Sequence, residues 1–144
     1  MSFLRPTSFT SPSTRTCEHA PVVERKLAAN LGTLFTHLPI ERRFDAAASA
    51  GFTAVELGDP YVLPAVRYQQ LLAAAGVRQV LINNPVGLPG SRAAQGWGCL
   101  PAHVTEFRQS MNRAFEYAAE LDCRAIHVRS GLVPPGATRT AALE

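Results

Sequence analysis

The stretch IERRFDAAASAGFTAVEL, residues 40–57, decides the fold because it joins a predicted helix to a predicted strand. Apolar side chains recur at helical spacing over 40–51, with Phe44 on the apolar face, and Gly51 ends the helix. The segment 53–57 that follows is short and almost wholly apolar, as expected of a strand covered on both faces. A helix followed this closely by such a strand is typical of an α/β protein.

The same alternation continues on both sides of this stretch. Strands are expected at 26–31, 53–57, 78–83 and 124–130. Helices are expected at 40–51, 64–76 and 101–122, and residues 136–144 resemble the start of a further helix. Strands that alternate with helices form right-handed βαβ units, in which the strands run parallel. The sequence therefore predicts an α/β fold with a parallel sheet.

This rhythm supplies about four βα units, whereas a (β/α)8 barrel of roughly 250 residues has eight. Four units form an open sheet with two uncovered edges, and such edges pair readily with another chain. Three interpretations follow: the N-terminal half of a longer (β/α)8 TIM barrel, a homo-oligomer formed through the exposed sheet edges, or a small open α/β domain.

Composition and charge exclude several classes of function. The 144 residues suit a single domain, and the net charge of +3 comes from scattered residues rather than a basic patch, so we predict no nucleic-acid partner. No apolar stretch approaches the roughly 20 residues of a membrane-spanning helix, which predicts no membrane contact. Neither a GxGxxG nor a GxxxxGK[ST] motif occurs, so nucleotide sites of those two kinds are unsupported.

The cysteines and the N-terminal segment bear on the cellular compartment. Cys17, Cys99 and Cys123 are widely spaced without a CxxC pair, which argues against zinc and disulfide frameworks and favours reduced thiols in the cytoplasm. Residues 1–25 are rich in Ser, Thr and Pro, and we interpret them as a disordered tail or an upstream extension of a domain at 26–144. Their arginines also fit an organellar transit peptide, although an amphipathic stripe is missing.

A polar residue lies at the end of each predicted strand. These residues are Asn30, Glu56, Asn83 and His127. In parallel α/β folds, ligands bind beyond the carboxyl ends of the strands. The four residues are therefore the candidate substrate-binding set, and the pattern across all four strands carries more weight than any single residue.

Each candidate also has a purely structural interpretation. Asn30 can cap the turn after its strand, and His127 between two apolar residues can be a hydrogen-bonded core histidine. Glu56 inside AVEL would be buried and would need a partner, which favours a site role. Turn chemistry accounts for much of Asn83, and Asn84, which precedes a proline, is most simply a turn residue.

A loop rich in glycine, QGWG at 95–98, follows the third predicted strand. Two interpretations of Trp97 are equally open: its ring covers a pocket as a lid, or it anchors the loop. The remaining histidines carry no clear functional signal; they are His19, His37 and His103.

Five segments occur in an order that is far more specific than one short motif. The first, LAANLGTLFTHLPIERRFDAAASAGFTAVEL, contains an A-N-L, a Leu-Phe pair and an RF…A…GF.AVE stretch. LINNPVG, CLPAHVTEFR, FEYAAELDCRAIHV and GLVPPGA follow it. In this order the segments resemble the hydroxypyruvate isomerase family of xylose-isomerase-like TIM barrels, which includes 2-oxo-tetronate isomerase. The resemblance covers about residues 26–144 and implies the N-terminal half of the barrel.

The resemblance implies an aldose–ketose type isomerase that interconverts hydroxypyruvate and tartronate semialdehyde through an enediol. A divalent metal, Mg or Mn, would hold the oxygens of this small hydroxy-carbonyl acid, and paired glutamates would move the proton. The family's metal ligands and catalytic glutamates lie on strands of the second half, so none carries over to this chain. We therefore expect a truncated, inactive chain whose four strand-end residues form part of the pocket wall.

Three loops depart from the family pattern. PPGD after the third strand reads PVGL with Leu88 in place of the acid, a GERG-like loop reads QGWG without its arginine, and MAG after the fourth strand reads RSG at 129–131. Because these loops line the family's pocket, two alternatives stay open. One is 2-oxo-tetronate isomerase or another sugar epimerase or isomerase of the superfamily, and the other is a non-catalytic half-barrel that binds a small acid or a partner chain.

Overall fold

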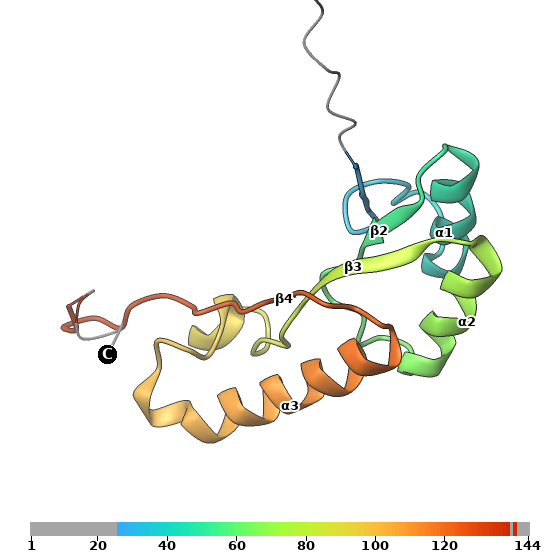
Figure 1. Cartoon of the computed structure of the whole chain (residues 1–144). Helices are drawn as coiled ribbons and strands as arrows, with labels where there is room; N and C mark the ends of the chain where they lie inside the picture. The colour runs from blue at the N-terminus through green and yellow to red at the C-terminus, as the bar shows by residue number, and fades with distance from the viewer. Residues whose placement is uncertain (1–25, 139, 141–144) are drawn as a thin grey trace, which may run out of the picture.

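The computed structural model describes residues 26–138 and 140, and it shows a four-stranded parallel sheet with helices along one face (Figure 1). The strands are β1 (Ala29–Asn30), β2 (Ala54–Glu56), β3 (Arg78–Asn83) and β4 (Ile126–His127). The helices are α1 (Ile40–Ser49), α2 (Ala65–Ala75) and α3 (Val104–Glu120), with short 3-10 helices η1 (Arg92–Gln95) and η2 (Pro101–His103). Neighbouring strands in the sheet are consecutive in the chain, in the order β1-β2-β3-β4. The predicted α/β fold with parallel strands is confirmed.

The predicted bounds agree best at the centre of the sheet. β3 has the predicted bounds 78–83, whereas the predicted edge strands 26–31 and 124–130 shorten to two residues each. An edge strand has a pairing partner on one side only, so little of its length forms a ladder. The helix expected at 101–122 begins instead with a 3-10 turn at Pro101, whose fixed φ and missing N–H suit a first turn.

The further helix expected at 136–144 is wrong where it can be examined. Gly136 has a φ of +84° in a turn, and residues 137 and 138 are not helical. Residues 139 and 141–144 lie outside the described part of the chain, and so does the segment 1–25 with its predicted tail.

One hydrophobic core lies between the helices and the sheet. Phe44 of α1 and Tyr68 of α2 are both buried, and their ring centroids lie 6.2 Å apart. They pack in the same cluster as Val55 of β2 and Ile82 of β3. Cys123 joins the cluster just after α3, where its thiol is buried. The core therefore holds the central strands in place and fixes the positions of their ends.

Helix α3 shows how the amphipathic pattern places the helical layer. Its buried residues recur at helical spacing and are Ser110, Ala114, Tyr117 and Ala118. The Tyr117 hydroxyl donates to the carbonyl oxygen of Leu63 at 2.9 Å, which ties α3 to the segment before α2. Among the described residues, no helix combines the length and the apolar character needed to cross a bilayer.

Candidate functional site

The first two predicted site residues form one hydrogen-bonded pair. Asn30 of β1 and Glu56 of β2 are partners in the ladder, and the Asn30 Nδ2 donates to Glu56 Oε1 at 2.9 Å. The Asn30 Oδ1 accepts from the backbone N–H of Gly32 at 2.9 Å, so the capping interpretation of Asn30 is also confirmed. Glu56 is half-buried rather than fully buried, because it lies at the open end of the strand. It has the partner that a partly desolvated carboxylate needs.

A shift in register separates this pair from the next strand end. The ladder between β2 and β3 is irregular between Val55 and Glu56, so Glu56 faces Leu81 and not Asn83. Gly58 lies beside Asn83 instead, and its carbonyl oxygen accepts from the Asn83 backbone N–H at 2.7 Å. A Cβ at Gly58 would lie only 2.5 Å from Asn83 Nδ2. The glycine therefore leaves the room that the Asn83 side chain occupies.

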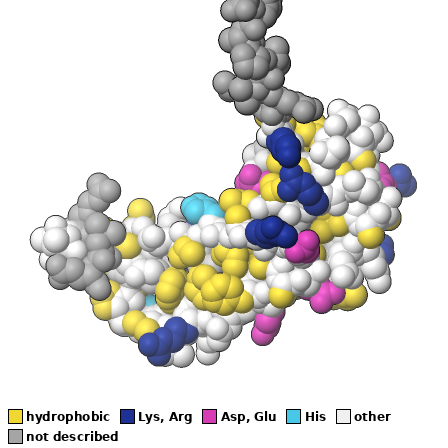
Figure 2. Space-filling model, viewed as in Figure 1, with side chains coloured by type: hydrophobic (Ala, Val, Ile, Leu, Met, Phe, Trp, Pro, Cys, Tyr) yellow, Lys and Arg dark blue, Asp and Glu magenta, His cyan; other side chains and the backbone are white. Residues whose placement is uncertain are grey.

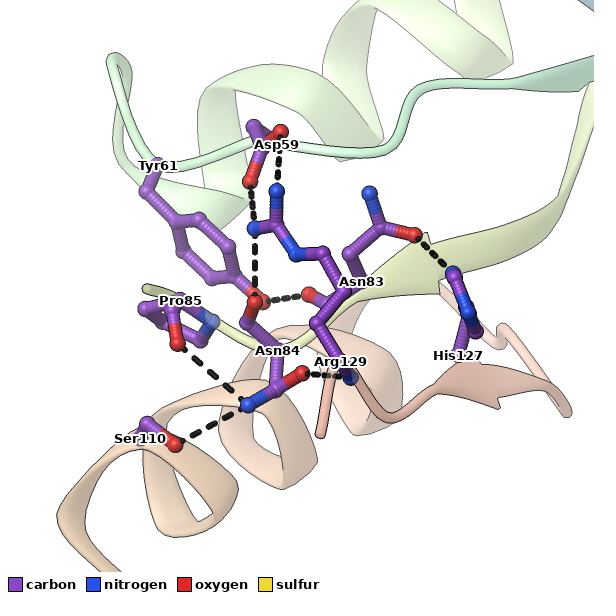
Figure 3. A network of polar contacts seen from close by, with 8 residues as sticks. All are labelled: Asp59, Tyr61, Asn83, Asn84, Pro85, Ser110, His127 and Arg129. Carbon is purple, nitrogen blue, oxygen red and sulfur yellow. Dashed lines mark hydrogen bonds and ion pairs between the residues drawn. The ribbon is translucent and has the colours of Figure 1, made fainter. Parts of the chain in front are cut away.

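The other two predicted site residues form a second pair. Asn83 of β3 and His127 of β4 are ladder partners, and Asn83 Oδ1 lies 3.1 Å from His127 Nδ1 (Figure 3). When Nδ1 carries the proton and donates to this oxygen, a neutral ring presents the lone pair of Nε2. His127 is exposed, so the interpretation as a core histidine is wrong. Its side chain is available to a ligand.

The two pairs leave three polar atoms available at the carboxyl end of the sheet. Within the described residues, Glu56 Oε2, Asn83 Nδ2 and His127 Nε2 have no hydrogen-bond partner, and none is an unsatisfied buried atom. One is an anionic acceptor, one a donor, and one an acceptor or donor according to protonation. Such a set suits the hydroxyl and carbonyl oxygens of a small polar ligand.

Asn84 directly follows Asn83 in the chain, and its structural role differs from that of the turn residue that was predicted. Its side chain is fully buried, and its Nδ2 donates to Ser110 Oγ on α3 at 3.2 Å. Its Oδ1 accepts from the backbone N–H of Arg129 at 2.7 Å (Figure 3). The Asn84 N–H itself donates to the His127 carbonyl oxygen at 3.2 Å, as a continuation of the ladder. Asn84 thus joins β3, α3 and the segment after β4.

An ion pair connects the loops that follow β2 and β4. Both Nη atoms of Arg129 contact the Asp59 carboxylate, and Arg129 Nη2 also donates to the Asn84 carbonyl oxygen at 2.8 Å. The Tyr61 hydroxyl donates to the Asn83 carbonyl oxygen in the same network (Figure 3). Burial, together with the nearby Asp59 charge, raises the pKa of Tyr61 above its ordinary value, so the hydroxyl stays protonated and remains a donor. The network holds the loop after β2 against the end of β3.

Trp97 contacts its own loop, which favours the anchoring interpretation. Its ring centroid lies 5.3 Å from that of His103. Gly96 forms an antiparallel bridge with Ser130, and the Cys99 N–H donates to the Ser130 carbonyl oxygen at 2.7 Å. This loop is therefore fixed to the segment that follows β4.

Sequence reasoning did not find Asp59, Tyr61 or Ser110. Asp59 and Arg129 are 70 residues apart, and their contact depends on two loops that meet at one edge of the sheet. One signal was present: Asp59 follows the predicted strand 53–57 by two residues, and Arg129 lies one residue before the end of the predicted strand 124–130, so both belong at the carboxyl edge. No comparable signal marks Ser110, which lies within a helix.

Replacing Asp59 by asparagine is expected to lower the free energy of unfolding by no more than about 1 kcal/mol, because Asp59 is mostly exposed and its ion pair is screened by solvent. Arg129→Gln is expected to cost more, because Arg129 is less exposed and also binds the Asn84 carbonyl. Urea denaturation at low and high salt measures both effects. Equal losses for the two variants would contradict the second role of Arg129.

Comparison with known proteins places this geometry in a family. The family described as "Xylose isomerase-like TIM barrel" matches residues 44–144. A 2-oxo-tetronate isomerase of Pectobacterium atrosepticum is 45% identical over 118 residues, which cover 81% of this chain and 44% of that protein. A Danio rerio protein provisionally named hydroxypyruvate isomerase is 41% identical over 117 residues, which cover 81% of this chain and 42% of that protein.

A solved structure agrees with the sequence relatives. The crystal structure of AP endonuclease, family 2, from Brucella melitensis superposes with a TM-score of 0.73 at 38% identity, covering 80% of this chain and 44% of that one. The chain thus spans less than half the length of the relatives it matches, and its four consecutive parallel strands correspond to half a barrel. This chain belongs to the xylose isomerase-like TIM barrel family.

Proposed function

We propose that the whole protein is a sugar-acid isomerase that interconverts hydroxypyruvate and tartronate semialdehyde through an enediol. The observation that carries this proposal is the row of four polar strand ends, in which Asn30 pairs with Glu56 and Asn83 with His127. The relatives named hydroxypyruvate isomerase and 2-oxo-tetronate isomerase support the choice of substrate class.

In this proposal the four residues bind and orient the substrate. Glu56 Oε2 accepts a hydrogen bond from a substrate hydroxyl, and Asn83 Nδ2 donates to a carbonyl or carboxylate oxygen. His127 Nε2 contacts the next oxygen along the short carbon chain. Their partners Asn30 Nδ2 and Asn83 Oδ1 hold the carboxylate and the imidazole in position, which is the usual contribution of supporting hydrogen bonds to a site.

A divalent metal, Mg or Mn, belongs to this proposal but not to the residues described. Within residues 26–138 and 140, no group of three or more His, Cys, Asp and Glu side chains is placed to hold a metal ion. One carboxylate oxygen of Glu56 already accepts a hydrogen bond from Asn30. The described residues therefore do not fit a metal centre, and the metal's ligands would have to come from another part of the barrel.

The isolated chain is accordingly expected to be inactive. The test adds Mg or Mn to the purified chain together with hydroxypyruvate. NMR then measures whether tartronate semialdehyde forms. In the part of the chain that the structure describes, no group of three or more such side chains is placed to hold a metal, and the paired acids that would move the proton are expected on the second-half strands. Robust turnover by the isolated chain would overturn this expectation.

A complementation experiment tests the role of Glu56. We expect the chain to gain isomerase activity when it is refolded with the part of the Pectobacterium atrosepticum relative that this chain does not match. In that mixture Glu56→Gln should lower kcat/KM about tenfold or more, because a charged acceptor to a substrate hydroxyl contributes roughly 1.5–3 kcal/mol. The matched control is Glu116→Gln on the exposed face of α3, which should leave activity unchanged. Equal activity of the two variants would remove Glu56 from the site.

A second substrate is favoured by one observation. The relative that is 45% identical is named 2-oxo-tetronate isomerase, and its substrate class has one more carbon than hydroxypyruvate. Parallel assays of both acids in the reconstituted mixture rank them by kcat/KM. Binding of either acid without turnover, in a mixture shown to be folded, would instead favour the non-catalytic binding module.

A further inference from the structure

The side chain of Arg129 crosses the end of β3, from the segment after β4 to the loop after β2 (Figure 3). In a continuing parallel ladder, the Arg129 N–H would donate to the Asn84 carbonyl oxygen, because the Asn84 N–H already donates to His127. The Asn84 side chain accepts that N–H instead, at 2.7 Å, and the freed carbonyl oxygen accepts from Arg129 Nη2 at 2.8 Å. This exchange draws the guanidinium back over the end of β3, on a face where Figure 2 shows polar and apolar side chains mixed.

A weak ion pair holds the guanidinium in this position. Arg129 Nη1 lies 3.4 Å from Asp59 Oδ2, and Nη2 contacts Asp59 Oδ1. Asp59 is 57% exposed, so solvent screens the pair. Two of the five guanidinium N–H groups contact Asp59 and one contacts Asn84, whereas Nε is buried without a hydrogen-bond partner among the described residues. Because an unpaired buried donor is unfavourable, a stronger acceptor can draw the guanidinium away from Asp59.

One available donor of the candidate site lies beside this ion pair. A Cβ at Gly58 would lie 2.5 Å from Asn83 Nδ2, and Asp59 directly follows Gly58 in the chain. An anion that accepts a hydrogen bond from Asn83 Nδ2 therefore lies next to the segment that holds Arg129. At the other pair, the carboxylate of Glu56 accepts hydrogen bonds from hydroxyl groups and repels a second carboxylate. Charge thus directs the acid group of a ligand toward Arg129 and its hydroxyl group toward Glu56.

We propose that Arg129 is a specificity-determining residue, whose guanidinium leaves Asp59 and binds the carboxylate of the substrate together with Asn83 Nδ2. The planar guanidinium binds both oxygens of a carboxylate at once, which selects a hydroxy acid over an uncharged sugar of the same length. Asp59 is the competitor that the ligand displaces. Arg43 does not take this role, because it donates to three backbone carbonyl oxygens around the loop after β1. The inference rests on the proposed function for the class of ligand.

Titration of the chain with glycerate, followed by NMR of the backbone and of the arginine Nε–H signals, tests the proposal. Glycerate is a hydroxy acid without an aldehyde or ketone, so its binding does not depend on turnover. Arg129→Gln should raise the dissociation constant at least about tenfold, because it removes a charge-assisted hydrogen bond. Asp59→Asn should lower it about two- to fivefold, because the competitor loses its charge. The matched control is Arg124→Gln, an exposed arginine before β4 at the opposite end of the sheet, which should change nothing.

The opposite effects expected for the two members of one ion pair separate ligand binding from a structural role. If Arg129 only holds the two loops together, Asp59→Asn and Arg129→Gln weaken glycerate binding alike, and the proposal is wrong. Unchanged binding by Arg129→Gln, equal binding of uncharged glycerol, or no glycerate binding by the wild-type chain would each overturn it too.

Circular dichroism checks that each variant is folded. If Arg129→Gln is not, Arg129→Lys replaces it, and a smaller loss in the same direction is expected because lysine keeps the charge but not the planar fork. The assay of the complemented mixture is separate: glycerate binding through Arg129 without isomerase activity there would count against the proposed isomerase and not against this carboxylate site.

Discussion

Replacing Asn84 by alanine is expected to lower the free energy of unfolding by about 3 kcal/mol, because buried polar groups lose their partners. The backbone N–H of Arg129 would lose its 2.7 Å acceptor, and Ser110 Oγ would lose the donor at 3.2 Å. The Asn84 side chain is fully buried, so water cannot replace these contacts without opening the junction. Urea denaturation followed by circular dichroism measures the loss.

The matched control for this prediction is Asn112→Ala, since Asn112 is an exposed asparagine on α3. That substitution should change the free energy of unfolding by less than about 0.5 kcal/mol, as surface changes usually do. A loss below about 1 kcal/mol for Asn84→Ala would show that the junction is not a main source of stability, because an unsatisfied buried group costs roughly 1–3 kcal/mol.

Leu72→Ala is expected to lower the free energy of unfolding by roughly 2–4 kcal/mol, the range for deleting a buried leucine side chain. Leu72 lies on α2 with 6% of its surface exposed, in the core cluster that includes Phe44 and Tyr68. The helix packs between α1 and α3, so its side chains have little freedom to move into the space left behind. Thermal and urea unfolding measure this loss independently.

Leu88→Ala provides the comparison, because Leu88 is 80% exposed in the loop after β3. The same deletion there removes almost no buried area and should leave the midpoint unchanged. If both variants lose stability equally, the helical layer is not packed against the sheet as the structure shows. A cooperative transition in the wild type is needed for both measurements to have a defined free energy.

The parts of the fold that depend on local sequence could be predicted. The helix at 40–51 was expected from its apolar spacing, and its observed end near Gly51 follows from a φ of +89° that glycine adopts easily. β3 was predicted at its observed bounds because Gly76 precedes its apolar run and Pro85 follows it, and both residue types commonly end a regular element. The edge strands were overestimated, since their length depends on partners that local sequence does not reveal.

The candidate site was predicted as a set of residues but not as two pairs. Asn30, Glu56, Asn83 and His127 follow from the rule that polar residues gather at the carboxyl ends of parallel strands. Their division into two pairs results from the irregular register at Glu56, which no sequence pattern marks. Asn84 was predicted to be a turn residue. Its partner Ser110 lies 26 residues further along the chain on a helix, so local sequence does not reveal their contact.

Each hydrogen-bonded pair in the site joins an edge strand to a central one. Asn30 and His127 lie on the two edge strands, whereas Glu56 and Asn83 lie on the interior strands. If either edge strand frays, one hydrogen-bonded pair is lost while the core stays folded. The site is therefore ordered only while both edge strands stay paired with the central strands. By linkage, a ligand that needs all four residues would stabilise the docked edges by the same factor by which their docking tightens its binding.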